Sequence, residues 1–280
     1  MVKPKGFRQE SISNLSLDLI DTAFLLLCEH ALPAYKQHIN SSRPPVDGRE
    51  NATSAAAIVM LLSGLDYHLC WLKYSKETIK LKISPPHAPI FSWSFDDYLV
   101  VKVRGLLTRR TERGLLAQII EITACRDSII HPKIYTITHV FDADFNIKHM
   151  KGCLVPGAKL RNKTKSVKMK RKDATKLLKI PLVPTWIGYA DAVLSVFVVY
   201  RLFLTLEIRY GKSYMPSAVL SRYARKAKHL FGDLEWPKDY RGTLQEWISA
   251  FYKSLSIRDQ EKVAKVLGGE FIPILGSNNR

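Results

Sequence analysis

GLLAQIIEITACRDSIIHP, residues 114–132, predicts an amphipathic helix that carries one charged side chain in its apolar stripe. The residues of that stripe follow one another at helical spacings of three or four, and they are Leu115, Ile119, Ile122, Arg126 and Ile129. A guanidinium on a core-facing stripe costs free energy unless another group pairs with it, because arginine is rarely buried alone. Arg126 is therefore a candidate functional residue.

The same helix is predicted to end beside a histidine. Five residues along an ideal helix turn a side chain by about 140°, so Arg126 and His131 cannot share one face of a continuous helix. Pro132 disfavours the helical conformation of the residue before it, which predicts that the helix ends near Ile130. His131 would then lie on the exit from the helix, where it can approach Arg126.

The run from Arg126 to His131 resembles the signature of the higher eukaryotes and prokaryotes nucleotide-binding (HEPN) domains, a family of all-α ribonucleases and their inactive relatives. That signature is an arginine, usually a polar residue, and a histidine after four to six intervening positions, near the end of a core helix. Here Asp127 is the polar residue. Arg222 and His229 fit the same spacing, but they fall on a predicted basic helix that is mostly exposed. The alternative for the first match is a structural arginine with a capping histidine.

The resemblance implies a metal-independent endoribonuclease without a cofactor, of the toxin or antiphage-defence kind. The ribose 2′-hydroxyl would attack the neighbouring phosphate, with His131 as general base or acid and Arg126 holding the phosphate. Asp127 or Asp66 would orient one of the two, because many family members carry an acidic residue at the place of Asp66. A solvated carboxylate on the flank of its helix is the alternative for Asp66.

Family members usually form their active cleft between two protomers, so the resemblance also implies a homodimer. RNA is the expected partner, with an antitoxin or a component of a defence system as a further one. The contrary class of function is a non-catalytic nucleic-acid-binding or scaffold protein that keeps the helical bundle without the chemistry. On that interpretation, Arg126 and His131 are structural residues.

Composition favours a polyanionic partner. The chain of 280 residues has 43 Lys and Arg against 25 Asp and Glu, a net charge of +18. Nucleic acid is the first candidate and an anionic membrane surface the second. The cysteines lie far apart without a Cys-x-x-Cys pair or a zinc spacing, so we expect reduced core thiols and no metal site. No signal-peptide pattern is found at the N-terminus, which favours the cytoplasm.

Much of the positive charge lies in one insertion after the motif helix (residues 114–130). Two strands are predicted at 135–141 and 146–150, with a third at 166–170. Phosphate binding is expected from a basic run in the insertion, although a solvated loop is the alternative. The predicted nucleic-acid-binding residues are Lys159, Arg161, Lys163, Lys165, Lys168, Lys170, Arg171 and Lys172.

The remaining apolar patterns complete a mainly α fold. Helices are predicted at 17–38, with a kink or an end at Pro33, at 54–74 and at 186–210. With the motif helix they would form the HEPN-like four-helix bundle. The first two should pack as an antiparallel pair.

Charges distinguish the most apolar of these helices from a membrane span. Asp191, Arg201 and Glu207 interrupt residues 186–210, and a span needs about 20 apolar residues, so a core helix is expected. Two further helices at 243–254 and 257–267 would form the tail.

The predicted organisation is a bundle over residues 1–213, which contains the basic, partly β insertion 133–181, and an α-helical C-terminal extension over 214–280. The pattern in residues 80–113 predicts no definite fold. Its aromatic residues form either a packing cluster or a base-stacking platform, and they are Phe91, Trp93, Phe95 and Tyr98.

Overall fold

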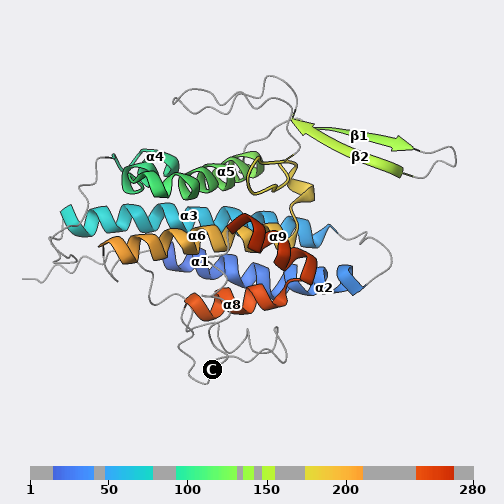
Figure 1. Ribbon diagram of the computed structural model, residues 1–280, viewed down its shortest axis with the longest axis horizontal. Coiled ribbons are helices and arrows are strands. Elements are labelled where there is room, and N and C mark those ends of the chain that lie inside the picture. Colours follow the sequence, from blue (N-terminus) through green and yellow to red (C-terminus); the bar gives the residue numbers. More distant parts are fainter. Residues whose placement is uncertain are drawn as a thin grey trace, which may run out of the picture.

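Helices make up most of the described chain, and they lie in layers around one long central helix (Figure 1). That helix, α3 (Arg49–Glu77), packs against α1 (Leu15–Leu26), α5 (Arg113–Ile130) and α6 (Tyr189–Tyr210). The computed structural model describes residues 15–40, 48–77, 93–130, 135–141, 147–154, 174–210 and 244–267. The mainly α fold predicted from the sequence is confirmed.

The first helical segment has a defect in its middle. α1 passes into a π-helical turn, Leu27–Ala31, and then into α2 (Leu32–Asn40). Pro33 explains the defect, because proline has no N–H to donate and its ring clashes with the carbonyl four residues earlier, that of Glu29. The wider π turn accommodates this clash, and the helix continues beyond it. The sequence predicted a kink or an end of the helix at Pro33. The structure has a π-helical turn there instead, and the helix continues as α2.

α3 and α6 form the centre of the core. α3 runs antiparallel to α1, as predicted (Figure 1), and begins at Arg49, earlier than the predicted start at residue 54. Every residue of α6 from Asp191 to Tyr200 is buried, which is why the sequence of this helix is apolar on all sides. By length and composition alone both helices are apolar enough to cross a membrane, and 56% of the α3 window and 78% of the α6 window are buried inside the bundle. A buried core helix passes the same test.

Residues 93–112 form a short helix between two turns. α4 (Leu99–Leu106) is followed by the 3-10 turn η2 (Arg110–Glu112), which leads directly into α5. The described aromatic residues divide, because Trp93 is buried whereas Phe95 and Tyr98 are 44% and 54% exposed. The Lys73 ammonium lies 5.5 Å from the centre of the Phe95 ring. Packing in the core therefore accounts for Trp93, and Phe95 contacts Lys73, but core packing does not account for Tyr98.

A two-stranded antiparallel hairpin follows α5. β1 (Tyr135–Phe141) pairs with β2 (Ile147–Leu154), and the register shifts between Val140 and Phe141. The hairpin extends from one end of the helical layers (Figure 1). The predicted third strand, the basic run 159–172 and the predicted helix with Arg222 and His229 lie outside the described residues. The β-rich basic insertion as a whole stays a prediction.

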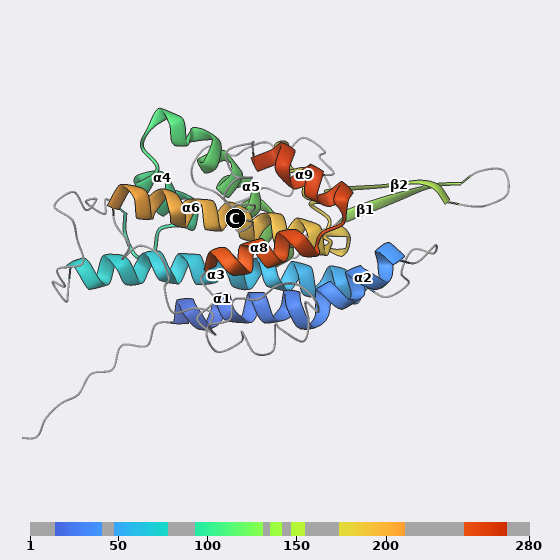
Figure 2. The same ribbon diagram turned by 60° about the horizontal axis from the view of Figure 1, so that its bottom comes forward.

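The two C-terminal helices share the core of the bundle. α8 (Leu244–Ser254) packs on α6, and α9 (Ile257–Leu267) crosses α6 beside the hairpin end (Figure 2). Trp247 is 1% exposed, and its ring centre lies 5.8 Å from that of Phe24 in α1. The ring of Phe251 makes an edge contact with the ring of Phe24, with 5.2 Å between the ring centres. Trp247 is therefore part of the core that the C-terminal helices share with α1.

Candidate active site

The motif helix has the position and the end that its sequence predicts. α5 runs from Arg113 to Ile130, and Leu115, Ile119 and Ile122 are buried in the core. Arg126 follows Ile122 by four residues, and its side chain remains 16% exposed. The apolar stripe therefore leaves the core at Arg126, one turn before the helix ends.

Asp127 is the partner of Arg126. Oδ1 of Asp127 accepts a hydrogen bond from Nη2 of Arg126 at 3.0 Å and another from Nε at 3.2 Å. Neighbouring residues on a helix do not face each other, so the arginine side chain has to bend sideways to make this contact. No other partner of the Arg126 side chain occurs among the residues that the structure describes. Nη1, on the other edge of the guanidinium, is left to bind an anion.

Asp66 does not orient Arg126 in this structure. Its Oδ1 accepts a hydrogen bond from Nζ of Lys102 in α4, at 2.8 Å, and Cys70 Sγ accepts another from the same ammonium at 3.0 Å. The prediction that Asp66 orients Arg126 is therefore wrong for this structure. Asp66 instead connects α3 to α4 through Lys102. Burial lowers the pKa of Lys102, which is 2% exposed, but the hydrogen bonds to Asp66 and Cys70 outweigh it and leave that pKa above its ordinary value.

Glu121, five residues before Arg126, holds the chain that returns from the basic insertion. Its carboxylate accepts four hydrogen bonds of 2.9 Å from three successive backbone N–H groups, those of Lys176, Leu177 and Leu178. Successive N–H groups directed at one point form an anion-binding nest. Lys179 has a φ of 57°, in the left-handed region, as the chain leaves the nest. The insertion is thus fixed to the motif helix at its C-terminal end.

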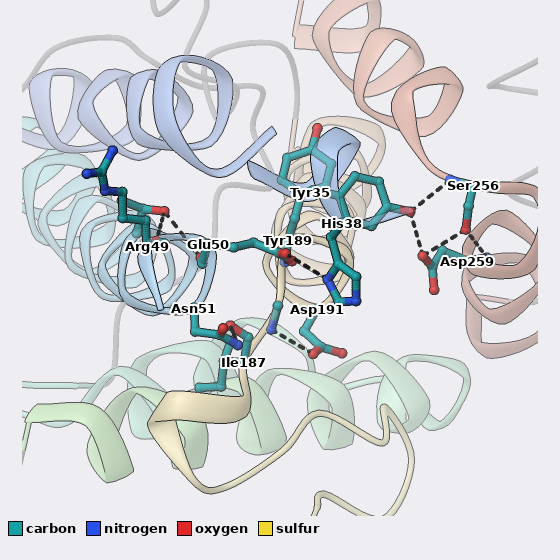
Figure 3. Close-up of polar contacts among 12 residues, drawn as sticks. Tyr35, His38, Arg49, Glu50, Asn51, Ile187, Tyr189, Asp191, Ser256 and Asp259 are labelled. Carbon is teal, nitrogen blue, oxygen red and sulfur yellow. Dashed lines mark hydrogen bonds and ion pairs between the residues drawn. The ribbon is translucent and has the colours of Figure 1, made fainter. Parts of the chain in front are cut away.

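Two buried carboxylates, those of Glu50 and Asp191, cap the start of α6 (Figure 3). Glu50 Oε1 accepts a hydrogen bond from the N–H of Tyr189 at 2.8 Å, and Asp191 Oδ2 accepts one from Gly188 at 3.1 Å. These bonds satisfy N–H groups that have no partner inside the helix. Burial raises the pKa of Asp191, although Lys262, 2.9 Å from its Oδ1, lowers it in part. The cluster is accounted for by helix capping.

Tyr35 connects α2 to the C-terminal helices (Figure 3). Its hydroxyl donates to Oδ2 of Asp259 at 2.5 Å and accepts from the N–H of Ser256 at 2.9 Å. Ser256 Oγ accepts a hydrogen bond from the N–H of Asp259 at 3.2 Å and so caps the start of α9. Burial and the bond to Asp259 raise the pKa of Tyr35 to about 12. This contact, too, is structural.

His131 and all of the predicted phosphate-binding residues lie outside the described residues. The latter are Lys159, Arg161, Lys163, Lys165, Lys168, Lys170, Arg171 and Lys172. Their roles stay predictions. Across the part of the chain that the structure does describe, no group of three or more His, Cys, Asp or Glu side chains could hold a metal ion.

Three described cysteines, Cys28, Cys70 and Cys125, are free thiols; Cys28 and Cys125 are buried, as predicted, whereas Cys70 is only partly buried. Burial raises the pKa of Cys125, which makes this neighbour of Arg126 a poor nucleophile. The side chain of Cys153 is outside the described part.

Sequence reasoning missed two charged residues that fix the elements around the motif helix. Lys102 interrupts the apolar run Leu99–Val103, and that interruption was an available signal of a buried partner. Glu121 gave no such signal, because a carboxylate on the flank of an amphipathic helix is ordinary. Its role depends on a loop more than 50 residues away in the sequence.

Comparison with known proteins adds no family: no family model matches the chain, and no curated protein and no solved structure matches it either.

Proposed function

We propose that this protein is a metal-independent endoribonuclease of the HEPN kind. One observation carries the proposal. Arg126 interrupts the buried stripe of α5 one turn before the helix ends, and among the described residues only Asp127 pairs with it. An arginine that a carboxylate holds on one edge is oriented in advance to donate hydrogen bonds to an anion from its other edge. The mainly α bundle around it is consistent with the all-α family that the sequence resembles.

The proposed reaction uses two side chains. Arg126 binds a phosphate oxygen with the edge that Asp127 leaves open and stabilises the charge that develops there. His131 removes the proton from the 2′-hydroxyl, or protonates the leaving 5′ oxygen. The attack forms a new bond from the 2′ oxygen to phosphorus and breaks the bond to the 5′ oxygen. The products are a cyclic phosphate end and a 5′-hydroxyl end.

A homodimer is part of the proposal. One arginine and one histidine provide a single clamp and a single base, whereas a twofold axis near the end of α5 brings two of each to one phosphodiester. Ile130, the last residue of α5, is 49% exposed in the single chain, which is consistent with an interface there. A toxin or antiphage effector in the cytoplasm, restrained by an antitoxin or a defence partner, is the setting that the resemblance suggests.

Cleavage of RNA in excess chelator tests the reaction. The wild-type protein should produce cyclic phosphate ends, and the Arg126→Ala and His131→Ala variants should not. Light scattering at micromolar concentration tests the dimer. Mixing the two inactive variants is a sharper test, because a shared cleft can regain activity by pairing one intact arginine with one intact histidine from different chains.

A second function is favoured by the same pair. Asp127 neutralises Arg126 within the chain, as a purely structural ion pair would. We propose as the alternative a non-catalytic nucleic-acid-binding or scaffold protein. Replacing both Arg126 and His131 by alanine would then alter stability without removing RNA binding, and the wild-type protein would cut no RNA.

A further inference from the structure

Three arginines stand together where α4 turns into α5. Arg109, Arg110 and Arg113 lie within five residues, and all three are exposed. Arg109 directly precedes the 3-10 turn η2, Arg110 is the first residue of that turn, and Arg113 is the first residue of α5. We call this set the arginine turn. It is formed by described residues and is separate from the basic run 159–172.

The one acidic residue in this stretch is used inside the protein. Glu112 is the only acid between Tyr98 and Ile120, and its side chain is 9% exposed. Its two carboxylate oxygens lie 3.2 and 3.1 Å from Nη1 of Arg209 at the end of α6, and Oε2 also accepts from the N–H of Arg109 at 2.8 Å. The charge of Glu112 is therefore cancelled by Arg209 rather than by the arginine turn.

Arg209 also makes the turn rigid. Its Nη1 donates to the carbonyl of Leu106 at 2.8 Å, and its Nη2 donates to Oγ1 of Thr108 at 2.9 Å. Leu106 is the last residue of α4 and Thr108 lies two residues beyond it, so one side chain from α6 holds the backbone that leads into the arginine turn. A binding surface that is fixed before the ligand arrives loses less entropy on binding.

Among the described residues, none of the three arginines has a carboxylate partner. Arginine presents a planar fork of donors that matches phosphate oxygens, and three such forks next to each other give a dense positive surface. We propose that the arginine turn binds backbone phosphates of RNA. This inference rests on the proposed function for the identity of the polyanion, and it adds a second contact region on the motif helix.

The geometry of α5 relates the two regions. Arg126 follows Arg113 by thirteen residues, which is a rise of about 20 Å along a helix and a rotation of about 140° around it. A strand that reaches both regions would therefore have to pass around α5 as well as along it and would span several nucleotides, and a dinucleotide is too short to reach both. Contacts of this kind fix the register of the strand without reading its bases.

RNA is favoured over an anionic membrane because the leucines beside the arginines in the sequence are buried, and the exposed apolar residue next to Arg209 in α6 is the single Ile208, which is 86% exposed. Leu106, Leu107 and Leu115 flank the arginines, and all three are buried. Surfaces that bind a bilayer combine basic residues with exposed apolar ones. Only the basic component is present in the arginine turn.

The test compares two triple variants in a His131→Ala background, which should separate binding from cleavage. Arg109→Gln, Arg110→Gln and Arg113→Gln remove three charges from the turn. Lys253→Gln, Arg258→Gln and Lys265→Gln remove three exposed charges from α8 and α9 and serve as the matched control. Binding to a labelled RNA of about 30 nucleotides is measured against salt concentration, and thermal melting checks the fold. Single substitutions replace the triple variant if it melts early.

We expect the arginine-turn variant to bind at least tenfold more weakly near 0.1 M salt, with a salt slope lower by about 2, as three lost phosphate contacts imply for a single strand. The control should bind within twofold of its parent. In proteins that retain His131, cleavage of a dinucleotide should be unaffected by the substitutions in the turn. If both triple variants weaken RNA binding equally, net charge alone explains it and the inference is wrong.

Binding to vesicles rich in anionic lipid separates the remaining outcomes. If the arginine-turn variant loses vesicle binding and keeps RNA binding, the surface is a lipid site and the inference is overturned. If the wild-type protein cuts no RNA while the arginine-turn variant loses RNA binding, the proposed function fails and the phosphate site stands.

Discussion

The carboxylate of Asp127 holds the guanidinium of Arg126 by two hydrogen bonds to a single oxygen, at 3.0 and 3.2 Å. The two residues are adjacent on one helix and both are only partly buried. An ion pair of this kind contributes little to stability, at most about 1 kcal/mol. Its main effect is to restrict the orientation of Arg126, so its removal should affect binding chemistry more than folding.

The first prediction concerns this orientation. Asp127→Ala should lower the rate of RNA cleavage by up to about 100-fold, because the phosphate clamp becomes mobile and is misplaced. Single-turnover kinetics and thermal melting measure the two effects separately. A variant that cleaves normally but loses several kcal/mol of stability would identify the pair as structural.

The pair formed by Asp66 and Lys102 predicts an asymmetric loss of stability. Asp66→Ala leaves a buried ammonium without its carboxylate and should cost about 3 kcal/mol. Lys102→Met leaves Asp66, which is 31% exposed and can be hydrated, so the loss should be smaller. Urea unfolding of both variants provides the comparison. Equal losses would mean that the burial of Lys102 does not control the energetics of the pair.

Glu121 predicts a local effect on the loop that it holds. Glu121→Ala should expose the N–H groups of residues 176–178 to solvent, and hydrogen exchange at these amides should become at least tenfold faster. Glu29→Ala, on the partly buried flank of the π-helical turn, is a control for loss of an acidic side chain elsewhere. Unchanged exchange at 176–178 would show that the nest does not depend on the carboxylate.

Tyr35 predicts a loss of stability at alkaline pH. A tyrosine in the unfolded chain has a pKa near 10, and in the folded protein that of Tyr35 is about 12. The folded state therefore holds the proton more tightly, and this contribution is complete below pH 10 and lost as the pH rises through 12. The free energy of unfolding should fall more steeply between pH 10 and 12 in the wild type than in Tyr35→Phe. If the free energy of unfolding falls equally in both proteins between pH 10 and 12, the raised pKa of Tyr35 does not contribute to stability.

Periodicity predicted the helices well because packing on one face repeats at fixed intervals. The end of α5 at Ile130 followed from Pro132, and a disturbance of the helix near Pro33 was predicted, although as a kink or an end rather than as a π-helical turn.

Polar partners across the fold were not predictable in the same way. Asp66 was assigned to Arg126, whereas Lys102 in α4 binds it, because nothing in the sequence around Asp66 indicates which helix lies opposite. Glu121 and Tyr35 likewise bind groups that are distant in the chain, 55 and 221 or more residues away. Long-range hydrogen bonds depend on the packed structure, and single-sequence patterns carry only local information.

The most direct test of the central claim is cleavage of a long single-stranded RNA by wild-type protein and by Arg126→Ala, in excess chelator. Both proteins are first shown to melt within a few degrees of each other, so that a difference in activity is not a difference in folding. We expect the wild type to leave 2′,3′-cyclic phosphate ends and the variant to be at least 1000-fold slower, about 4 kcal/mol of lost transition-state stabilisation. Equal cleavage by the two proteins, or cleavage that requires an added divalent metal, would contradict the assignment of Arg126 to a metal-independent active site.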